Sequence, residues 1–283
     1  MFIIVESGST KADWLIVNGE QQKAVNTIGF NPYFHSEEDI LLELNDNLEL
    51  GLVKDQIDEL HFYGAACNEE DLNAKVHDAF SSFFINAKIF ISHDLTACAY
   101  ACYSGVDAIC CILGTGSNSC YFDGKTIREE IPALSYILGD EGSGSFFGKK
   151  LLADFLYNKL PRAIATELKQ MGMNKQTIVE NVYLKPSPNV FIASFMPILI
   201  RHREIDYAQN LIKEGFQKFI DIHVKCYENY QDVEVSFVGS IASLLEKELR
   251  DVCEINGIIV AKIIRRPLDK LAEYHLQELK NRA

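Results

Sequence analysis

The fold is decided by residues 2–19, FIIVESGSTKADWLIVNG, which hold an apolar run, a turn of small residues, a second apolar run and an Asn-Gly pair. A short apolar run bounded by turn residues predicts a buried strand, and Asn-Gly is a strong signal for a hairpin. Residues 108–124, AICCILGTGSNSCYFDG, repeat this order about one domain length later and close on Asp-Gly. The repetition predicts two related lobes.

The rest of the chain alternates strand and helix patterns. Strands are expected at 22–26, 60–63, 87–91, 233–238 and 257–264, and helices starting near Ser36 and Asn68 and over 95–103, 241–250 and 268–279, with a mostly helical stretch at about 140–230. No low-complexity linker separates the halves. We therefore expect an α/β chain with an N-terminal lobe at 1–105, onto which the last helix (267–283) packs back, and a C-terminal lobe at 106–266 with a helical insertion.

Composition narrows the partners. The 283 residues include 40 acidic and 27 basic side chains, for a formal net charge of −13, so a nucleic acid or an anionic membrane is not expected as partner. No apolar stretch reaches the about 18 residues of a membrane span, and the N-terminus lacks the pattern of a signal peptide, so a cytoplasmic protein is expected. The eight cysteines form no Cys-x-x-Cys pair, which favours free buried thiols over disulfides or zinc.

The two glycine turns indicate phosphate binding. Neither a P-loop nor a Rossmann fingerprint is present, and each turn joins a strand to another strand. Backbone N–H groups and hydroxyls of such turns form concavities that suit phosphate oxygens. A single turn of this kind is also explained by plain hairpin closure, but two matched turns, one per lobe, favour a grip on a triphosphate.

Three segments resemble the motifs of the sugar kinase/Hsp70/actin superfamily. Residues 6–11 resemble its first phosphate motif, 113–118 its second, and 237–240 its adenosine motif. Residues 138–144, LGDEGSG, resemble the signature of N-acetylhexosamine kinases, which are grouped with the BadF/BadG-type ATPases. The resemblance covers essentially the whole chain. It implies an α/β fold of two ribonuclease-H-like (actin-like ATPase) lobes with a central nucleotide and sugar cleft.

The resemblance also implies ATP and Mg²⁺ as cofactors. The implied ATP-binding residues are Ser7, Gly8, Ser9, Thr10 and Lys11 in the first turn, Gly114, Thr115, Gly116, Ser117 and Asn118 in the second, and Gly239 and Ser240 in the adenosine motif. Glu6 is implied to hold the magnesium ion, directly or through water, because Mg²⁺ takes only one or two carboxylates and keeps several waters. The alternative for Glu6 is a plain surface carboxylate at the end of a strand.

Asp94 follows the strand expected at 87–91, where the family places its general base. A carboxylate beside the attacking sugar hydroxyl would accept its proton as the phosphoryl group moves. The alternative is an N-cap for the helix at 95–103, and the two roles are compatible.

The implied sugar-binding residues are Asn31, Gly64, Ala65, Asp94, Asp140 and Glu141. Carboxylates and carboxamides bind sugar hydroxyls at fixed geometry, so a wrong sugar leaves them unpaired. Asn31 precedes a proline and is also explained as a turn residue. Residues 64–66 read Gly-Ala-Ala where family members often show Ser-Gly-Gly, a departure beside the 2-substituent of the sugar.

The resemblance therefore implies an ATP-dependent kinase of a small-molecule amino sugar, N-acetylglucosamine at O6 first, with glucosamine or an N-acetylmuramic-type sugar as close alternatives. Two other functions stay open: a BadF-type ATPase activator, and a catalytically inactive sugar- or nucleotide-sensing protein. The activator would need a cysteine-ligated iron–sulfur cluster, for which the cysteine spacing offers no pattern. A homodimer stays open as the assembly.

Overall fold

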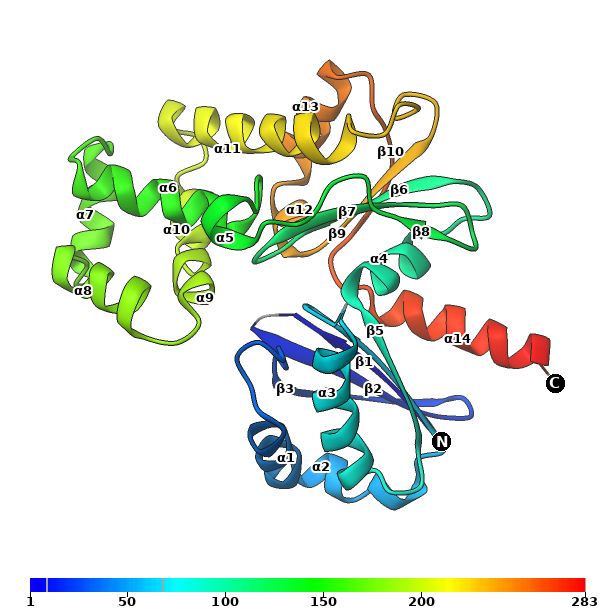
Figure 1. Ribbon diagram of the computed structural model, residues 1–283. Coiled ribbons are helices and arrows are strands. Elements are labelled where there is room, and N and C mark those ends of the chain that lie inside the picture. Colours follow the sequence, from blue (N-terminus) through cyan, green and yellow to red (C-terminus); the bar gives the residue numbers. More distant parts are fainter. Residues whose placement is uncertain (9, 68, 283) are drawn as a thin grey trace. The chain divides into compact units, whose positions relative to one another are not determined.

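The structure, a computed structural model, describes residues 1–8, 10–67 and 69–282. The chain divides into two compact units (Figure 1). The first contains Met1–Ala101 together with the C-terminal residues from Pro267, and the second contains Cys102–Arg266. Each unit carries one five-stranded sheet.

The sheet of the first unit has the strand order β3-β2-β1-β4-β5. Its strands are β1 (Phe2–Ser7), β2 (Lys11–Asn18), β3 (Gln21–Ile28), β4 (Glu59–Gly64) and β5 (Lys88–His93). β1, β2 and β3 form an antiparallel meander, and β4 and β5 run parallel to β1. Gly19 closes the hairpin between β2 and β3 with φ 60°, a conformation that glycine adopts without strain.

Helices cover both faces of this sheet. They are α1 (Glu37–Asp46), α2 (Leu48–Gly51), α3 (Glu70–Phe83), α4 (Asp94–Cys102) and α14 (Leu268–Arg282), with a 3₁₀ turn η1 (Lys54–Gln56). The predicted start of α1 is confirmed by a capping box between Ser36 and Asp39. One core joins Trp14 of β2 to Phe80 of α3, and a second, on the opposite face, includes Leu271 of α14.

The sheet of the second unit repeats the same topology in the order β10-β9-β6-β7-β8. Its strands are β6 (Ala108–Leu113), β7 (Ser117–Phe122), β8 (Ile127–Arg128), β9 (Glu234–Val238) and β10 (Ile259–Ile264). β6, β7 and β8 are antiparallel, while β9 and β10 run parallel to β6. The predicted pair of related lobes is thereby confirmed, and the short strand β8 was not expected.

The middle of the chain is helical, as predicted. Its helices are α5 (Ser135–Leu138), α6 (Gly144–Leu156), α7 (Arg162–Gln170), α8 (Lys175–Val179), η2 (Glu180–Leu184), α9 (Pro188–Ala193), α10 (Met196–Arg201), α11 (Asp206–Phe219) and η3 (Ile220–Val224). Between β9 and β10 lie α12 (Ser240–Leu244) and α13 (Glu246–Ile255). The single helix expected at 241–250 is wrong. The chain breaks at Leu245, which is fully buried and leaves the helical conformation (φ −116°, ψ 33°). This one residue separates α12 from α13.

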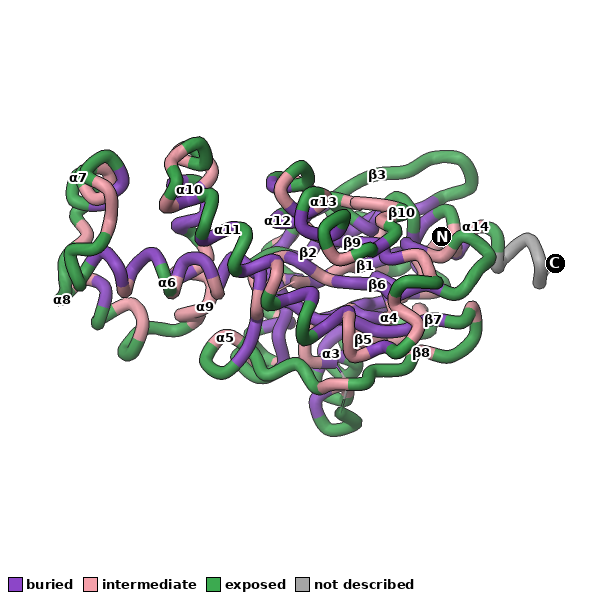
Figure 2. Tube along the Cα trace, turned by 90° about the horizontal axis from the view of Figure 1, so that it is seen from above, coloured by how far each residue is buried: buried purple, intermediate pink, exposed green. Residues whose placement is uncertain are grey.

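Two cores stabilise the second unit. One packs the sheet against α11 and α13 and includes Phe216 and Leu249, and the other joins the helices of the insertion around Leu151 and Ile164. α6 contributes to both, and Figure 2 shows buried residues along much of its length. None of the helices within the described ranges is long and apolar enough to cross a bilayer.

Candidate active site

The parallel strands of the first unit bring predicted site residues to one sheet edge. The register pairs Glu6 of β1 with Tyr63 of β4, and Gly64, the last residue of β4, with His93 of β5. Asp94 follows directly as the first residue of α4. Because β1, β4 and β5 are neighbours with the same direction, Glu6, Gly64 and Asp94 converge at their carboxyl ends.

Glu6 lies in a setting that disfavours a negative charge. Burial raises its pKa from an ordinary 4.5 to about 7, and the carboxylates of Asp94 and Asp13 add to this rise while Lys11 opposes it. A cation at this edge would restore the ionised form. Among the described residues, no three Asp, Glu, His or Cys side chains are arranged to hold a metal, so a metal here would take its other ligands from water and substrate.

Asp94 combines partial exposure with an oxygen that lacks a hydrogen bond. Its side chain is 23% exposed, and its Oδ1 lies 3.2 Å from His93 Nε2. That contact lacks hydrogen-bond geometry, and within the described part of the chain the buried Oδ1 has no hydrogen-bond partner. An unused carboxylate acceptor at a sheet edge is suited to receive a proton from a bound hydroxyl. As the first residue of α4, Asp94 also keeps the helix-start interpretation open.

Asp13 is a buried carboxylate at the same edge that sequence reasoning missed. It pairs with Glu6 across β1 and β2. Lys11 Nζ donates to its two oxygens at 2.8 and 2.7 Å, and Asn26 Nδ2 donates to Oδ1 at 2.5 Å. The Lys11 ammonium, predicted to bind ATP, is thus held by Asp13. The available signal was a charged residue inside the otherwise apolar run 12–17.

The other residues of the first glycine turn differ in burial and hydrogen bonding. Gly8 N–H closes the turn with a 3.1 Å backbone hydrogen bond, and Thr10 is exposed. Ser9 lies outside the described residues. The Ser7 hydroxyl is fully buried and accepts from Phe30 N–H at 2.8 Å, so it anchors the loop after β3.

Asn31 lies in that anchored loop and is 8% exposed. Its Oδ1 accepts from Tyr33 N–H at 2.9 Å, and its backbone N–H donates to His35 Nδ1 at 3.1 Å. The side-chain oxygen of Asn31 therefore stabilises the turn, which agrees with the interpretation of Asn31 as a turn residue. Within the part of the chain that the structure describes, the amide nitrogen is the group that remains for a ligand.

The residues after β4 are tightly constrained. A Cβ on Gly64 would lie 2.3 Å from the Phe62 ring and 2.9 Å from Cys67 Sγ, so only glycine fits. Ala65 N–H donates to the backbone at the end of β1 at 3.0 Å. Ala66 has φ 66°, a left-handed conformation that costs an alanine roughly 1–2 kcal/mol. These constraints hold the backbone of residues 64–66 close to the strand ends.

The glycine turn of the second unit is folded onto the start of α6. Gly114 N–H donates to Gly116 O at 2.9 Å, which closes the turn. Gly144 and Ser145 donate their backbone N–H groups to Gly114 O and Thr115 O at 2.9 and 3.0 Å. The second phosphate motif (113–118) and the LGDEGSG segment (138–144) are therefore in direct contact.

Asp140 joins these signatures through its side chain. Ser117 N–H donates to Asp140 Oδ1 at 3.3 Å, and a Cβ on Gly116 would lie 3.0 Å from the same oxygen. Burial raises the pKa of Asp140 from 3.8 to about 6, against the opposing effects of Ser117 N–H and Lys149. Ser117 Oγ is buried and, among the described residues, has no hydrogen-bond partner.

Glu141 and Asn118 already have protein partners. Glu141 Oε2 lies 3.4 Å from Nε2 of the buried His223. Burial lowers the pKa of His223, and Glu141 opposes this. Asn118 accepts from Ser119 N–H at 2.8 Å and donates to Glu129 at 3.5 Å. His223 orients Glu141, and no local pattern singled it out because it lies far along the chain.

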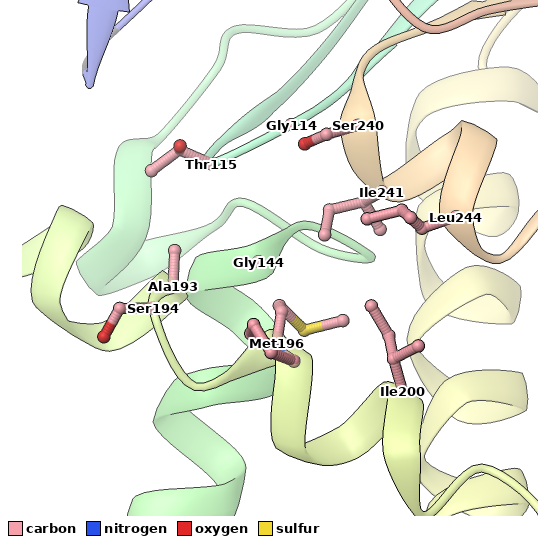
Figure 3. A pocket seen from close by; sticks show the side chains of 11 residues that line it. Gly114, Thr115, Gly144, Ala193, Ser194, Met196, Ile200, Ser240, Ile241 and Leu244 are labelled. Carbon is pink, nitrogen blue, oxygen red and sulfur yellow. The ribbon is translucent and has the colours of Figure 1, made fainter.

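A cavity of about 240 Å³ adjoins the glycine turn of the second unit (Figure 3). Gly114, Thr115 and Ser240 border it on one side. Gly239 has φ 126°, and a Cβ there would lie 2.3 Å from Leu113 O. The ends of β6 and β9 therefore pack closely, which places the predicted second phosphate and adenosine motifs beside one cavity.

The opposite walls of the cavity are apolar, and sequence reasoning missed them. They are formed by Ala193, Met196, Pro197, Ile200, Ile241 and Leu244. In sequence these residues have the same apolar helical pattern as residues of a core, and only tertiary packing places them at a cavity.

A solved structure from Porphyromonas gingivalis named "Putative N-acetylglucosamine Kinase" is similar to this chain over nearly its whole length. The identity is 32%, the TM-score is 0.92, and the match covers 98% of this chain and 99% of the other. The chain belongs to the N-acetylglucosamine kinase and BadF/BadG-type ATPase family.

More distant structures share the family's fold. A structure from Chromobacterium violaceum with the same name matches at 15% identity and TM-score 0.69, covering 96% of this chain and 98% of the other. A ROK family glucokinase from Streptomyces griseus, solved with glucose and AMPPNP, matches at 14% identity and TM-score 0.55, covering 94% of each chain. The two units thus have the two-lobe actin-like sugar kinase fold. No family model matches the sequence. No curated protein matches it either.

Proposed function

We propose that this protein is an ATP-dependent kinase of an amino sugar, with N-acetylglucosamine at O6 as the first candidate. The observation that carries this proposal is the buried Oδ1 of Asp94, which has no hydrogen-bond partner among the described residues and lies at the sheet edge shared with Glu6 and Gly64. A sugar hydroxyl donating to this oxygen would supply the missing bond. Family membership supports the kinase assignment.

In the proposed reaction Asp94 accepts the proton of the sugar hydroxyl. The hydroxyl oxygen forms a bond to the γ-phosphorus, the bond between that phosphorus and the β–γ bridging oxygen breaks, and ADP leaves with the electron pair. Asp94 later releases the proton to water. General base assistance of this kind typically contributes 10²–10⁴-fold to the rate.

In the first unit, Asn31 and the backbone at Gly64 and Ala65 are assigned to sugar recognition. In the second unit, taken by itself, Asp140 and Glu141 carry a separate assignment to sugar hydroxyls. The constrained backbone after β4 and the buried setting of Asp140 support this assignment, because rigid polar groups penalise a sugar that leaves them unpaired. Ionised Asp140 accepts hydrogen bonds from hydroxyls, and its pKa of about 6 keeps it mostly ionised above neutrality.

The nucleotide is assigned to the second unit. The cavity beside Gly114, Thr115 and Ser240 suits an adenosine, and the small residues of the glycine turn let a phosphate approach the backbone beside that cavity. A magnesium ion fits Glu6, whose pKa is raised first by burial and then by the carboxylates of Asp94 and Asp13. When bound, the ion would neutralise charge on the phosphates.

The test measures sugar phosphate formed from ATP across N-acetylglucosamine, glucosamine, N-acetylmuramic acid and glucose. Asp94→Asn is expected to lower kcat by about 10²–10⁴-fold while sugar binding, followed by calorimetry, is kept. Asp46→Asn, an exposed acid at the end of α1, is the matched control and keeps full activity. ATP hydrolysis at a rate that no sugar changes contradicts the kinase proposal and favours the ATPase activator. Binding of sugar without turnover favours a sensor.

A further inference from the structure

The cavity of the second unit offers a nucleotide base apolar contact and few groups that read its edge. Met196 and Ile200 of α10 face Ile241 and Leu244 of α12 (Figure 3). These four side chains carry no nitrogen or oxygen. All eleven lining residues are described by the structure, and none of them carries a carboxylate, amide, imidazole or cationic group.

The polar atoms of the walls are largely engaged within the protein. Gly114 O accepts from Gly144 N–H, and Thr115 O accepts from the backbone and hydroxyl of Ser145 at 3.0 and 2.7 Å. The Ser194 hydroxyl donates to a backbone carbonyl at 2.7 Å. These groups are therefore not available to distinguish one base edge from another.

The position of the phosphate turn orients a bound nucleotide. Triphosphate at Gly114 and Thr115 and ribose near Ser240 place the base against the apolar wall of α10 and α12 (Figure 3). Leu244 is 40% exposed, so the wall reaches the mouth of the cavity. Exocyclic groups of a base can keep their water there.

Resting on the nucleotide role proposed above, we infer that this enzyme uses GTP as well as ATP as phosphoryl donor. A pocket that binds by apolar contact discriminates similar ligands by about 100-fold at most, whereas a pocket that pairs with a specific donor or acceptor rejects the wrong ligand by 10⁴-fold or more. The ratio of kcat/KM for ATP over GTP is therefore expected to stay below about 100.

The first experiment measures both binding and turnover. ATP and GTP each displace a fluorescent N-methylanthraniloyl-ATP from the protein, and sugar phosphate is detected directly by mass spectrometry with each nucleotide as donor. Dissociation constants and kcat/KM values within about 100-fold of one another support the inference. A preference for ATP beyond this range overturns it.

The second experiment tests the wall itself. Ile200→Ala removes apolar contact and is expected to weaken displacement by ATP and by GTP alike, each by roughly tenfold. Ile222→Ala, at a 41% exposed isoleucine of η3 outside the cavity, is the matched control and changes neither. Weakening of ATP alone, or no weakening of either nucleotide, contradicts the assignment.

Failure of this inference and failure of the proposed function give different results. If no sugar is phosphorylated with any donor, the kinase proposal fails, and the displacement measurement still decides how the pocket treats the two bases. If sugars are instead phosphorylated from ATP, while GTP does not displace the probe and does not act as donor, only the inference on the base fails.

Discussion

The two units repeat one sheet topology, but the turn after the first strand is stabilised differently in each. In the first unit the edge gathers the carboxyl groups of Glu6, Asp13 and Asp94, and burial and mutual repulsion raise the pKa of Glu6. In the second unit the turn is fixed by backbone bonds to Gly144 and by close packing around Gly239. Charge dominates the first edge and steric fit dominates the second.

This difference teaches how a repeated scaffold takes on two roles. The first edge can change charge, as proton transfer and metal binding require. The second presents a rigid backbone surface, as the positioning of a nucleotide requires.

Gly239→Ala tests the close packing in the second unit and is expected to destabilise the protein more than the other substitutions. The new Cβ would lie 2.3 Å from Leu113 O at a φ of 126°, so β6 and β9 must separate. A loss of about 3 kcal/mol or more in the free energy of unfolding is expected from urea denaturation. Gly8→Ala in the first turn is the matched control, because its Cβ meets only Lys11 O at 3.9 Å. Equal losses of unfolding free energy in Gly239→Ala and Gly8→Ala would contradict the difference in close packing between the two turns.

Glu6→Gln tests the charged side through pH. The folded protein holds the Glu6 proton more tightly than the unfolded chain, so stability falls as pH rises from about 4.5 to about 7. The substitution should remove this fall and stabilise the protein at pH 8 by on the order of 2–3 kcal/mol. Urea denaturation at pH 5 and pH 8 measures it, with the exposed Glu254→Gln of α13 as control. An unchanged pH dependence in Glu6→Gln would contradict the raised pKa of Glu6.

Gly116→Ala tests whether packing in the second unit controls the sugar site. Its Cβ would lie 3.0 and 3.1 Å from the two Asp140 oxygens and would displace that carboxylate. Sugar affinity without nucleotide, measured by calorimetry, should fall about tenfold, the equivalent of one lost hydrogen bond. Gly114→Ala is the control, because no heavy atom lies within 4 Å of its Cβ. Equal sugar affinity in the two variants would contradict the assignment of Asp140 to sugar binding.

The Lys11–Asp13 ion pair should give the smallest effect. Lys11 is 46% exposed, so water screens the pair although Asp13 is buried. A double-mutant cycle with Lys11→Met and Asp13→Asn should return a coupling below about 1 kcal/mol that decreases at high salt. A coupling above about 2 kcal/mol, insensitive to salt, would contradict this expectation and place the pair among the buried, unscreened interactions.

The elements of the fold were largely predictable because their signals are local. Apolar runs, the Asn-Gly and Asp-Gly pairs and the Ser36 cap each act within a few residues, and the strands and helices they predicted are present. The helix expected at 241–250 is divided at Leu245, because that residue leaves the helical conformation inside an otherwise continuous helical pattern.

The sequence by itself determined the two repeated lobes and the residue types at their turns, including Glu6, Asp94 and the LGDEGSG segment. Only the tertiary structure decided that Asp13 joins Glu6, that His223 orients Glu141, and that α10 and α12 enclose an apolar cavity. The physical reason is separation along the chain. Hydrophobic periodicity and turn chemistry act on neighbours, whereas burial, charge repulsion and cavity shape arise only when distant segments pack together.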